Sequence, residues 1–140
     1  MDCVFCRIIS GELPAYIIHQ DEWTLSFLDI NPFTWGHALV LPKDHFASLK
    51  ELPDGMVSPL MKNISLVAKA VIRAAGVDSF NVLLNDGGVA GQIVPHIHFH
   101  VVPRSPGDGL HFKTARRDFR EEEMKDIQES IITCLADLNP

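Results

Sequence analysis

The chain has 140 residues, of which 46% are hydrophobic and 21% are charged, and this length and composition predict one ordinary globular domain. Its formal net charge of −6 disfavours non-specific binding to a nucleic-acid backbone. No segment resembles a signal peptide or approaches the ~18 apolar residues of a membrane span. We therefore expect a cytoplasmic protein with no membrane or nucleic-acid partner.

The N-terminal third predicts a short helix followed by three strands. Residues 5–9 are expected to form the helix, which ends at a turn-like run containing glycine and proline. The strands are expected over residues 16–20, 23–28 and 37–41, because β-branched and aromatic residues are bounded there by polar turns. Short links between consecutive strands favour antiparallel pairing.

A long helix and two further strands follow. Ser58 is expected to cap the helix with Pro59 at its first position, and Gly76 is expected to end it. Residues 80–85 predict a fourth strand, which leads through a glycine-rich loop to a fifth strand over residues 95–104.

The C-terminal segment predicts a second long helix. Three glutamates open it at Glu121, and apolar residues recur at helical spacing. Cys134 falls in that apolar pattern and is expected in the core. We interpret residues 1–140 as a single α+β domain, with a core over residues 1–104 and a C-terminal loop and helix over residues 105–140. The expected apolar stripe of this helix consists of Met124, Ile127, Ile131, Leu135 and Leu138.

The fifth strand carries the strongest functional signal in the chain. Side chains alternate across a strand, so His96, His98 and His100 are expected on one face, about 7 Å apart. Three imidazoles in a row contribute little to stability. Histidine binds metals, carries protons and acts as a nucleophile near neutral pH. The pattern therefore indicates a catalytic or metal-binding site.

A close cysteine pair indicates a second site. Cys3 and Cys6 have the spacing of half a zinc site, and three cysteines do not make a disulfide framework. His45 and His96 could complete a closed, structural Cys₂His₂ set. A redox dithiol and simple packing of the two thiols are alternatives. In another arrangement His96 and His98 would bind one metal together, which would make the protein a metal-dependent hydrolase with His98 as a ligand.

Several motifs together resemble the histidine triad (HIT) family. The segment His96–Val102 fits the family's His-x-His-x-His signature followed by two apolar residues, and the likeness covers most of the chain. Other matching segments are Cys3–Pro14, Phe27–Pro32, Gly36–His45 and Gly91-Gln92. The resemblance implies a HIT-like α+β fold, with an about five-stranded, mainly antiparallel sheet and two main helices. It also implies a homodimer whose sheet extends across the two-fold axis.

The resemblance also implies an activity on nucleotides. The family cleaves at the α-phosphate of a nucleoside phosphoanhydride or phosphoramidate and releases a nucleoside monophosphate such as AMP. His98 would attack phosphorus and form a nucleotidyl-histidine intermediate, and His100 and His37 would flank the phosphate. The expected substrate is a purine nucleotide.

The resemblance assigns the remaining site residues. Asp29 would accept hydrogen bonds from the ribose hydroxyls, and Asn85 would contact phosphate or ribose. Phe5, Ile8, Phe27 and Ile30 would line the base pocket, and Gly91, Gln92 and Ile93 would lie beside the phosphate. Structural zinc would be bound by Cys3, Cys6, His45 and His96.

Ile93 departs from the family pattern. This position often carries serine or threonine, whose hydroxyl assists the leaving group, and isoleucine offers no side-chain donor. A phosphoanhydride needs less assistance, so a dinucleoside polyphosphate is at least as plausible a substrate as a phosphoramidate. A third hypothesis is a nucleotide-binding or scaffold protein with incidental hydrolysis.

Overall fold

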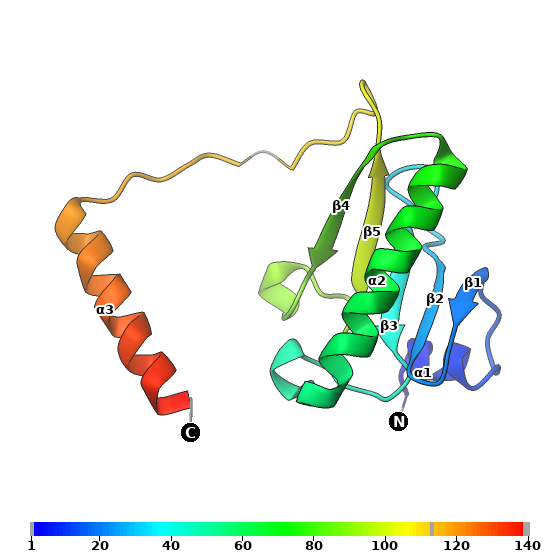
Figure 1. The fold of residues 1–140 in the computed structure, drawn as a ribbon, viewed down its shortest axis with the longest axis horizontal. Helices are drawn as coiled ribbons and strands as arrows, with labels where there is room; N and C mark the ends of the chain where they lie inside the picture. Colours follow the sequence, from blue (N-terminus) through cyan, green and yellow to red (C-terminus); the bar gives the residue numbers. More distant parts are fainter. Residues whose placement is uncertain (1, 113, 139–140) are drawn as a thin grey trace. The chain divides into compact units, whose positions relative to one another are not determined.

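The computed structural model describes residues 2–112 and 114–138 and divides the chain into two compact units. One unit extends to Leu110 and the other begins at His111. The first unit holds an antiparallel five-stranded sheet in the order β1-β2-β3-β5-β4 (Figure 1). Its strands are β1 (Ile17–Gln20), β2 (Thr24–Leu28), β3 (Ala38–Pro42), β4 (Ser79–Leu84) and β5 (Phe99–Arg104). The expected α+β class and antiparallel sheet are confirmed.

Two α-helices accompany this sheet. The short α1 (Val4–Ile9) precedes β1, and α2 (Asp54–Ala75) runs across one face of the sheet (Figure 1). Two 3₁₀ turns, η1 (Leu49–Glu51) and η2 (Gly88–Ala90), lie in the loops that flank α2 and β4.

The sheet separates two clusters of apolar side chains, as alternation along its strands requires. From β3, Ala38 and Val40 pack with Val101 of β5 against α2. Leu39 and Leu41 point the other way and pack with Phe5 of the N-terminal segment. Since His100 is paired with Leu39 in the ladder, the histidines lie on the face opposite α2.

The start of α2 corrects the expected cap. The helix begins at Asp54 after Pro53, so Ser58 and Pro59 lie inside it. Pro59 lies in the second turn, where its missing N–H leaves the carbonyl of Gly55 without its helical hydrogen bond. The end at Gly76 is as expected: its φ of 69° is the left-handed conformation that glycine adopts readily. By length and composition α2 could also cross a membrane, but seven of its residues are buried and it packs on the sheet.

The fifth strand is shorter than predicted. It begins at Phe99, so His96 and His98 precede the ladder. The amide of Ile97 donates to the carbonyl of Phe46 instead of to a neighbouring strand. Consequently the three imidazoles do not form an evenly spaced row. The rings of His98 and His100 are 5.0 Å apart, and His96 turns toward the cysteines.

The second unit contains α3 (Glu121–Leu138), whose bounds match the expected helix. Its predicted apolar stripe is exposed, with more than half of each of these side chains accessible. Cys134 is exposed as well, so the expectation that it lies in a core is wrong for the unit as described.

Candidate functional site

A cavity of about 570 Å³ opens on the sheet face opposite α2. Its volume is in the range of small-molecule and nucleotide sites. The structure brings together ten of the residues expected to form the catalytic and substrate-binding site: Phe5, Ile8, Phe27, Asp29, Ile30, Asn85, Gly91, Ile93, His98 and His100. His37 lies behind them, in contact with His100.

The carbonyl of His96 fixes the orientation of His98. Nδ1 of His98 lies 2.7 Å from this oxygen, and because a carbonyl only accepts, Nδ1 carries the hydrogen. Burial lowers the pKa of His98, which keeps the ring neutral near pH 7. The lone pair is therefore on Nε2, the nitrogen left for the cavity. The ring of Phe5 meets His98 edge to face at 4.9 Å and limits its rotation.

A backbone amide sets the hydrogen positions on the other two histidines. The N–H of Phe33 donates to Nδ1 of His37 over 3.0 Å, so the hydrogen of neutral His37 is on Nε2. Nε2 of His37 then donates to Nδ1 of His100 over 2.9 Å. This leaves His100 with an Nε2–H donor. His98 thus presents an electron pair and His100 presents a hydrogen.

Both of these supporting histidines are held neutral. Burial, followed by the neighbouring His98 and His37, lowers the pKa of His100 to about 4. Burial also lowers the pKa of His37, opposed by the charge of Asp29. The 3.7 Å separation between Nε2 of His37 and Oδ2 of Asp29 is therefore a contact with a neutral ring and not an ion pair.

The two carboxylate oxygens of Asp29 have different roles: one accepts a backbone hydrogen bond, and the other is available to the cavity. Oδ1 accepts the amide of Asn31 at 2.9 Å and so closes the turn after β2. Oδ2 remains available to a ligand. Asp29, His37 and His100 are close enough to hold a cation. However, Nε2 of His37 carries a hydrogen because Nδ1 accepts from Phe33, so this group does not offer three free lone pairs.

The glycine-rich loop depends on Gly91 and Gln92. Gly91 has a φ of 96°, and a Cβ there would lie 3.7 Å from the side-chain amide of Asn85. Gln92 does not line the cavity. Its amide accepts from Gly87 and donates to Ala47 and Val94, which braces the loop that carries Ile93.

Sequence reasoning missed several lining residues, among them Phe33. Its ring lies 4.9 Å from the ring of His37 and is stacked on His100 at 6.4 Å. The position of this aromatic residue four before His37, in a loop that follows Asp29, was the available signal. Others missed are Val4, Leu13, Pro14, Ala15, Leu28, Asn31, Leu39 and Val94.

A second cluster joins the N-terminal segment to the end of β3. The Sγ and Nδ1 atoms of Cys3, Cys6, His45 and His96 all lie within 4.8 Å of one another. The Cys6–His45 separation is 3.3 Å, and His96 is 3.6 Å from each sulfur. Tetrahedral zinc with ordinary bond lengths places sulfur and nitrogen about 3.6 Å apart. The donor set and its spacing therefore fit zinc.

His96 is oriented as a metal ligand by its other nitrogen. Nε2 lies 2.8 Å from the carbonyl of Pro42 and donates to it, so the lone pair is on Nδ1, which faces the sulfurs. His98 belongs to neither of the clusters with metal-ligand geometry in residues 2–112 and 114–138. The arrangement in which His96 and His98 share one metal gains no support.

Comparison with known proteins agrees with this geometry. The sequence model described as "HIT domain" matches residues 10–107. "Adenylylsulfatase HINT3" of Arabidopsis thaliana is 38% identical over 136 residues, which are 96% of this chain and 68% of the relative. "Adenosine 5'-monophosphoramidase hnt1" of Schizosaccharomyces pombe is 37% identical over 94% of this chain and 96% of its own. A Zn-bound histidine triad family protein from Mycobacterium smegmatis superposes with a TM-score of 0.75 at 41% identity, covering 99% of each chain.

Replacement of Gly91 by alanine tests the loop geometry. A Cβ at a φ of 96° is strained, so we expect Gly91→Ala to lower the free energy of unfolding by about 1–2 kcal/mol. Gly88→Ala is the matched control, because its φ is not left-handed and its Cβ would meet no atom within 4 Å. Chemical denaturation measures both. If Gly91→Ala and Gly88→Ala were equally stable, the left-handed conformation of Gly91 would be contradicted.

The pKa of His100 predicts a pH dependence of stability. Unfolded histidine binds a proton below about pH 6.5, whereas folded His100 binds it only near pH 4. The unfolded state therefore holds more protons between these values, and the free energy of unfolding should fall as pH falls from 6.5 toward 4. His100→Gln should show a shallower fall than the wild type, measured by denaturation at pH 5, 6 and 7. If the free energy of unfolding fell equally steeply with pH in the wild type and in His100→Gln, the lowered pKa of His100 would be contradicted.

Proposed function

Because this chain belongs to the HIT domain family, we propose that it is a nucleotide hydrolase or nucleotidyl transferase that cleaves at an α-phosphate and releases a nucleoside monophosphate such as AMP. Two relatives carry the names adenylylsulfatase and adenosine 5'-monophosphoramidase, and both names refer to adenosine compounds of this kind. The observation that carries the proposal is the hydrogen bond from His98 to the carbonyl of His96, which leaves a neutral nucleophilic nitrogen in the cavity.

In the proposed first step, Nε2 of His98 attacks the α-phosphorus. The new N–P bond forms as the bond from phosphorus to the leaving group breaks, and the leaving group departs with the bonding electrons. The ring becomes cationic, and its Nδ1–H remains bound to the carbonyl of His96, which stabilises the charge. Nε2–H of His100 is the donor available to a phosphate oxygen, where negative charge develops.

In the second step, water or another acceptor attacks phosphorus from the side that the leaving group vacated. The N–P bond breaks, the electrons return to Nε2, and the nucleoside monophosphate departs. His98 regains its neutral form with the hydrogen still on Nδ1. The covalent intermediate divides one difficult displacement into two easier ones.

The charges around the cavity favour substrates with a single phosphate. None of the lining residues is lysine or arginine, and the one carboxylate among them is that of Asp29. A dinucleoside polyphosphate would bring several further negative charges without a cation to neutralise them. We therefore favour adenosine phosphoramidates or adenylyl sulfate over dinucleoside polyphosphates. Ile93, which is 92% exposed, would place an apolar surface beside the leaving group.

The proposal includes structural zinc and a homodimer. Zinc would be held by Cys3, Cys6, His45 and His96, and it would tie the N-terminal segment to the sheet.

The dimer would form at β4, which is an edge strand of the sheet. This strand exposes 41% of Phe80 and 41% of Val82, which suits pairing with a second copy. A cytoplasmic location agrees with free thiols at the metal cluster.

Removal of the nucleophile tests the reaction. We expect His98→Ala to lower turnover of adenosine 5'-phosphoramidate by about three orders of magnitude or more, with AMP affinity nearly unchanged. His111→Ala, which removes an exposed histidine of the second unit, is the control. Release of AMP is measured by chromatography, with diadenosine tetraphosphate as the competing substrate. AMP binding without wild-type turnover of either substrate would favour the scaffold hypothesis.

Loss of the metal distinguishes structural from catalytic zinc. Cys6→Ser should abolish binding of one zinc per chain and lower the melting temperature by roughly 10 °C, as expected for a loss of ~3 kcal/mol. Cys134→Ser is the matched control and should change neither. At temperatures where the Cys6→Ser variant is still folded, it should retain the turnover that depends on His98. Complete loss of turnover in a folded, zinc-free protein would instead support the metal-dependent hydrolase.

A further inference from the structure

The loop between β2 and β3 carries the backbone amide that orders the histidine hydrogens. The ends of this loop are joined, because the amide of Asp29 donates to the carbonyl of His37 over 3.0 Å. Within the loop, the amide of Phe33 donates to Nδ1 of His37, also over 3.0 Å. An amide keeps its direction only while the backbone around it keeps its conformation. The position of the loop therefore decides whether Nδ1 of His37 accepts this hydrogen bond.

One side chain connects this loop to β5. The hydroxyl of Thr34 donates to the carbonyl of Pro103 over 2.7 Å, across 69 positions of the sequence. The carbonyl of Thr34 accepts the amide of His37 over 3.1 Å. Thr34 is thus bound to the sheet through its side chain and to His37 through its backbone. It also directly follows Phe33, whose amide is the donor to His37.

Pro103 explains why a side chain makes this contact. The ladder between β3 and β5 ends at Ala38 and Val101, and its register would next place Gly36 opposite Pro103. Proline has no N–H to donate, so the ladder does not continue there. The hydroxyl of Thr34 pairs with the carbonyl that is left. The loop also lies close to the strand at this point, since a Cβ on Gly36 would be 3.5 Å from Cγ of Pro103.

Hydrogens can be ordered in two directions along His37 and His100. With the amide of Phe33 in place, Nδ1 of His37 accepts, its Nε2 donates to His100, and Nε2 of His100 keeps a hydrogen for the phosphate. Without that amide, His37 could carry its hydrogen on Nδ1, and its Nε2 would accept from Nδ1 of His100. Nε2 of His100 would then present a lone pair, which repels a phosphate oxygen. Only the first direction supplies the donor that the proposed reaction uses.

We propose that Thr34 is a positioning residue: its hydroxyl, bound to Pro103, holds the loop so that the amide of Phe33 selects the Nε2–H forms of His37 and His100. Thr34 does not line the cavity and would act only through this loop. Its effect on turnover rests on the proposed function. The hydrogen positions that it fixes do not, because they are set without substrate.

¹⁵N NMR of the histidine side chains tests the hydrogen positions directly, because ring nitrogens with a hydrogen and with a lone pair differ widely in chemical shift. Thr34→Val keeps the shape of the side chain and removes the hydroxyl, whereas Thr34→Ser keeps the hydroxyl. The full-length protein is purified with zinc and studied above neutral pH. In the wild type and in Thr34→Ser we expect the hydrogen on Nε2 of His37 and of His100. In Thr34→Val both rings should show shifts averaged over two tautomers, while those of His98 stay unchanged.

Kinetics separate positioning from a general loss of stability. Thr34→Val should lower kcat for adenosine 5'-phosphoramidate about tenfold and change KM by no more than about twofold, because the donor on His100 matters most where charge develops in the transition state. Thr34→Ser should restore most of the wild-type kcat.

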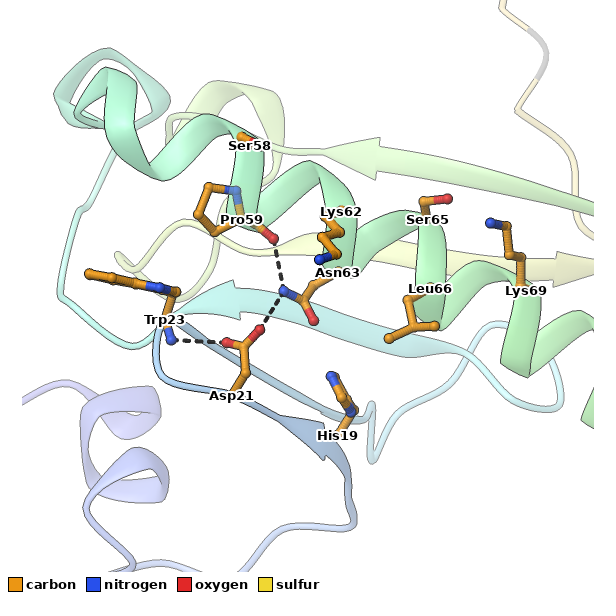
Figure 2. Close-up of a pocket in the computed structure, with 10 residues that line it drawn as sticks. All are labelled: His19, Asp21, Trp23, Ser58, Pro59, Lys62, Asn63, Ser65, Leu66 and Lys69. Atoms are coloured by element: carbon orange, nitrogen blue, oxygen red, sulfur yellow. Dashed lines mark hydrogen bonds between the residues drawn. The ribbon is translucent and has the colours of Figure 1, made fainter.

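Thr24→Val is the matched control. The hydroxyl of Thr24 donates to Oδ1 of Asp21 over 3.2 Å. Asp21 also accepts the amide of Trp23 and the side chain of Asn63, on the face of the sheet that α2 covers (Figure 2). The variant therefore loses a comparable hydrogen bond on the face opposite His100. It should change neither the histidine spectra nor kcat.

The NMR result decides the proposal. Wild-type hydrogen positions in Thr34→Val would overturn it whatever happens to kcat, and so would a Thr34→Ser variant that behaves like Thr34→Val. Altered hydrogen positions in Thr34→Val, without wild-type turnover of the substrate, would support the positioning by Thr34 and count against the proposed function. If Thr34→Val does not fold, Thr34→Ala replaces it in the same comparison.

Discussion

The carbonyl oxygen of His96 is the point on which the candidate site depends. It accepts Nδ1–H of His98 over 2.7 Å and so decides which nitrogen of His98 holds the lone pair. The side chain of the same residue points the other way, toward Cys3 and Cys6, with its own hydrogen committed to the carbonyl of Pro42. One residue thus connects the metal-ligand cluster to the proposed nucleophile. Zinc there would act on the reaction through the position of that backbone oxygen and through Phe5, which lies between Cys3 and Cys6 and contacts the ring of His98.

The hydrogen positions on His37 and His100 are fixed in a similar way, by a chain of hydrogen bonds. Each ring nitrogen of His37 and His100 is either a donor or an acceptor, and the amide of Phe33 decides which. Burial keeps the rings neutral, so the order persists at physiological pH. A neutral nucleophile next to a neutral donor, without lysine or arginine around the cavity, suits displacement at a single phosphate group.

The sequence predicts what depends on side-chain periodicity and misses what depends on backbone direction. Alternation along β3 and β5 places His100 on the face opposite the apolar cluster that packs against α2, and the spacing of Cys3 and Cys6 marks the metal cluster. The amide of Phe33 leaves no trace in a pattern of side chains. The early end of strand pairing before Phe99 is equally hidden. Ser58 and Pro59 have the residues of a helix start, but α2 begins at Asp54 and contains both of them.

Direct detection of the covalent intermediate is the measurement that tests this account most closely. Wild-type protein would be mixed with excess adenosine 5'-phosphoramidate and stopped in alkali within milliseconds, since phosphorus–nitrogen bonds to histidine break in acid. The account predicts a chain that is heavier by one adenylyl group, with the modification mapped to His98. Rapid turnover without any such adduct, or an adduct mapped to a different residue, would contradict it.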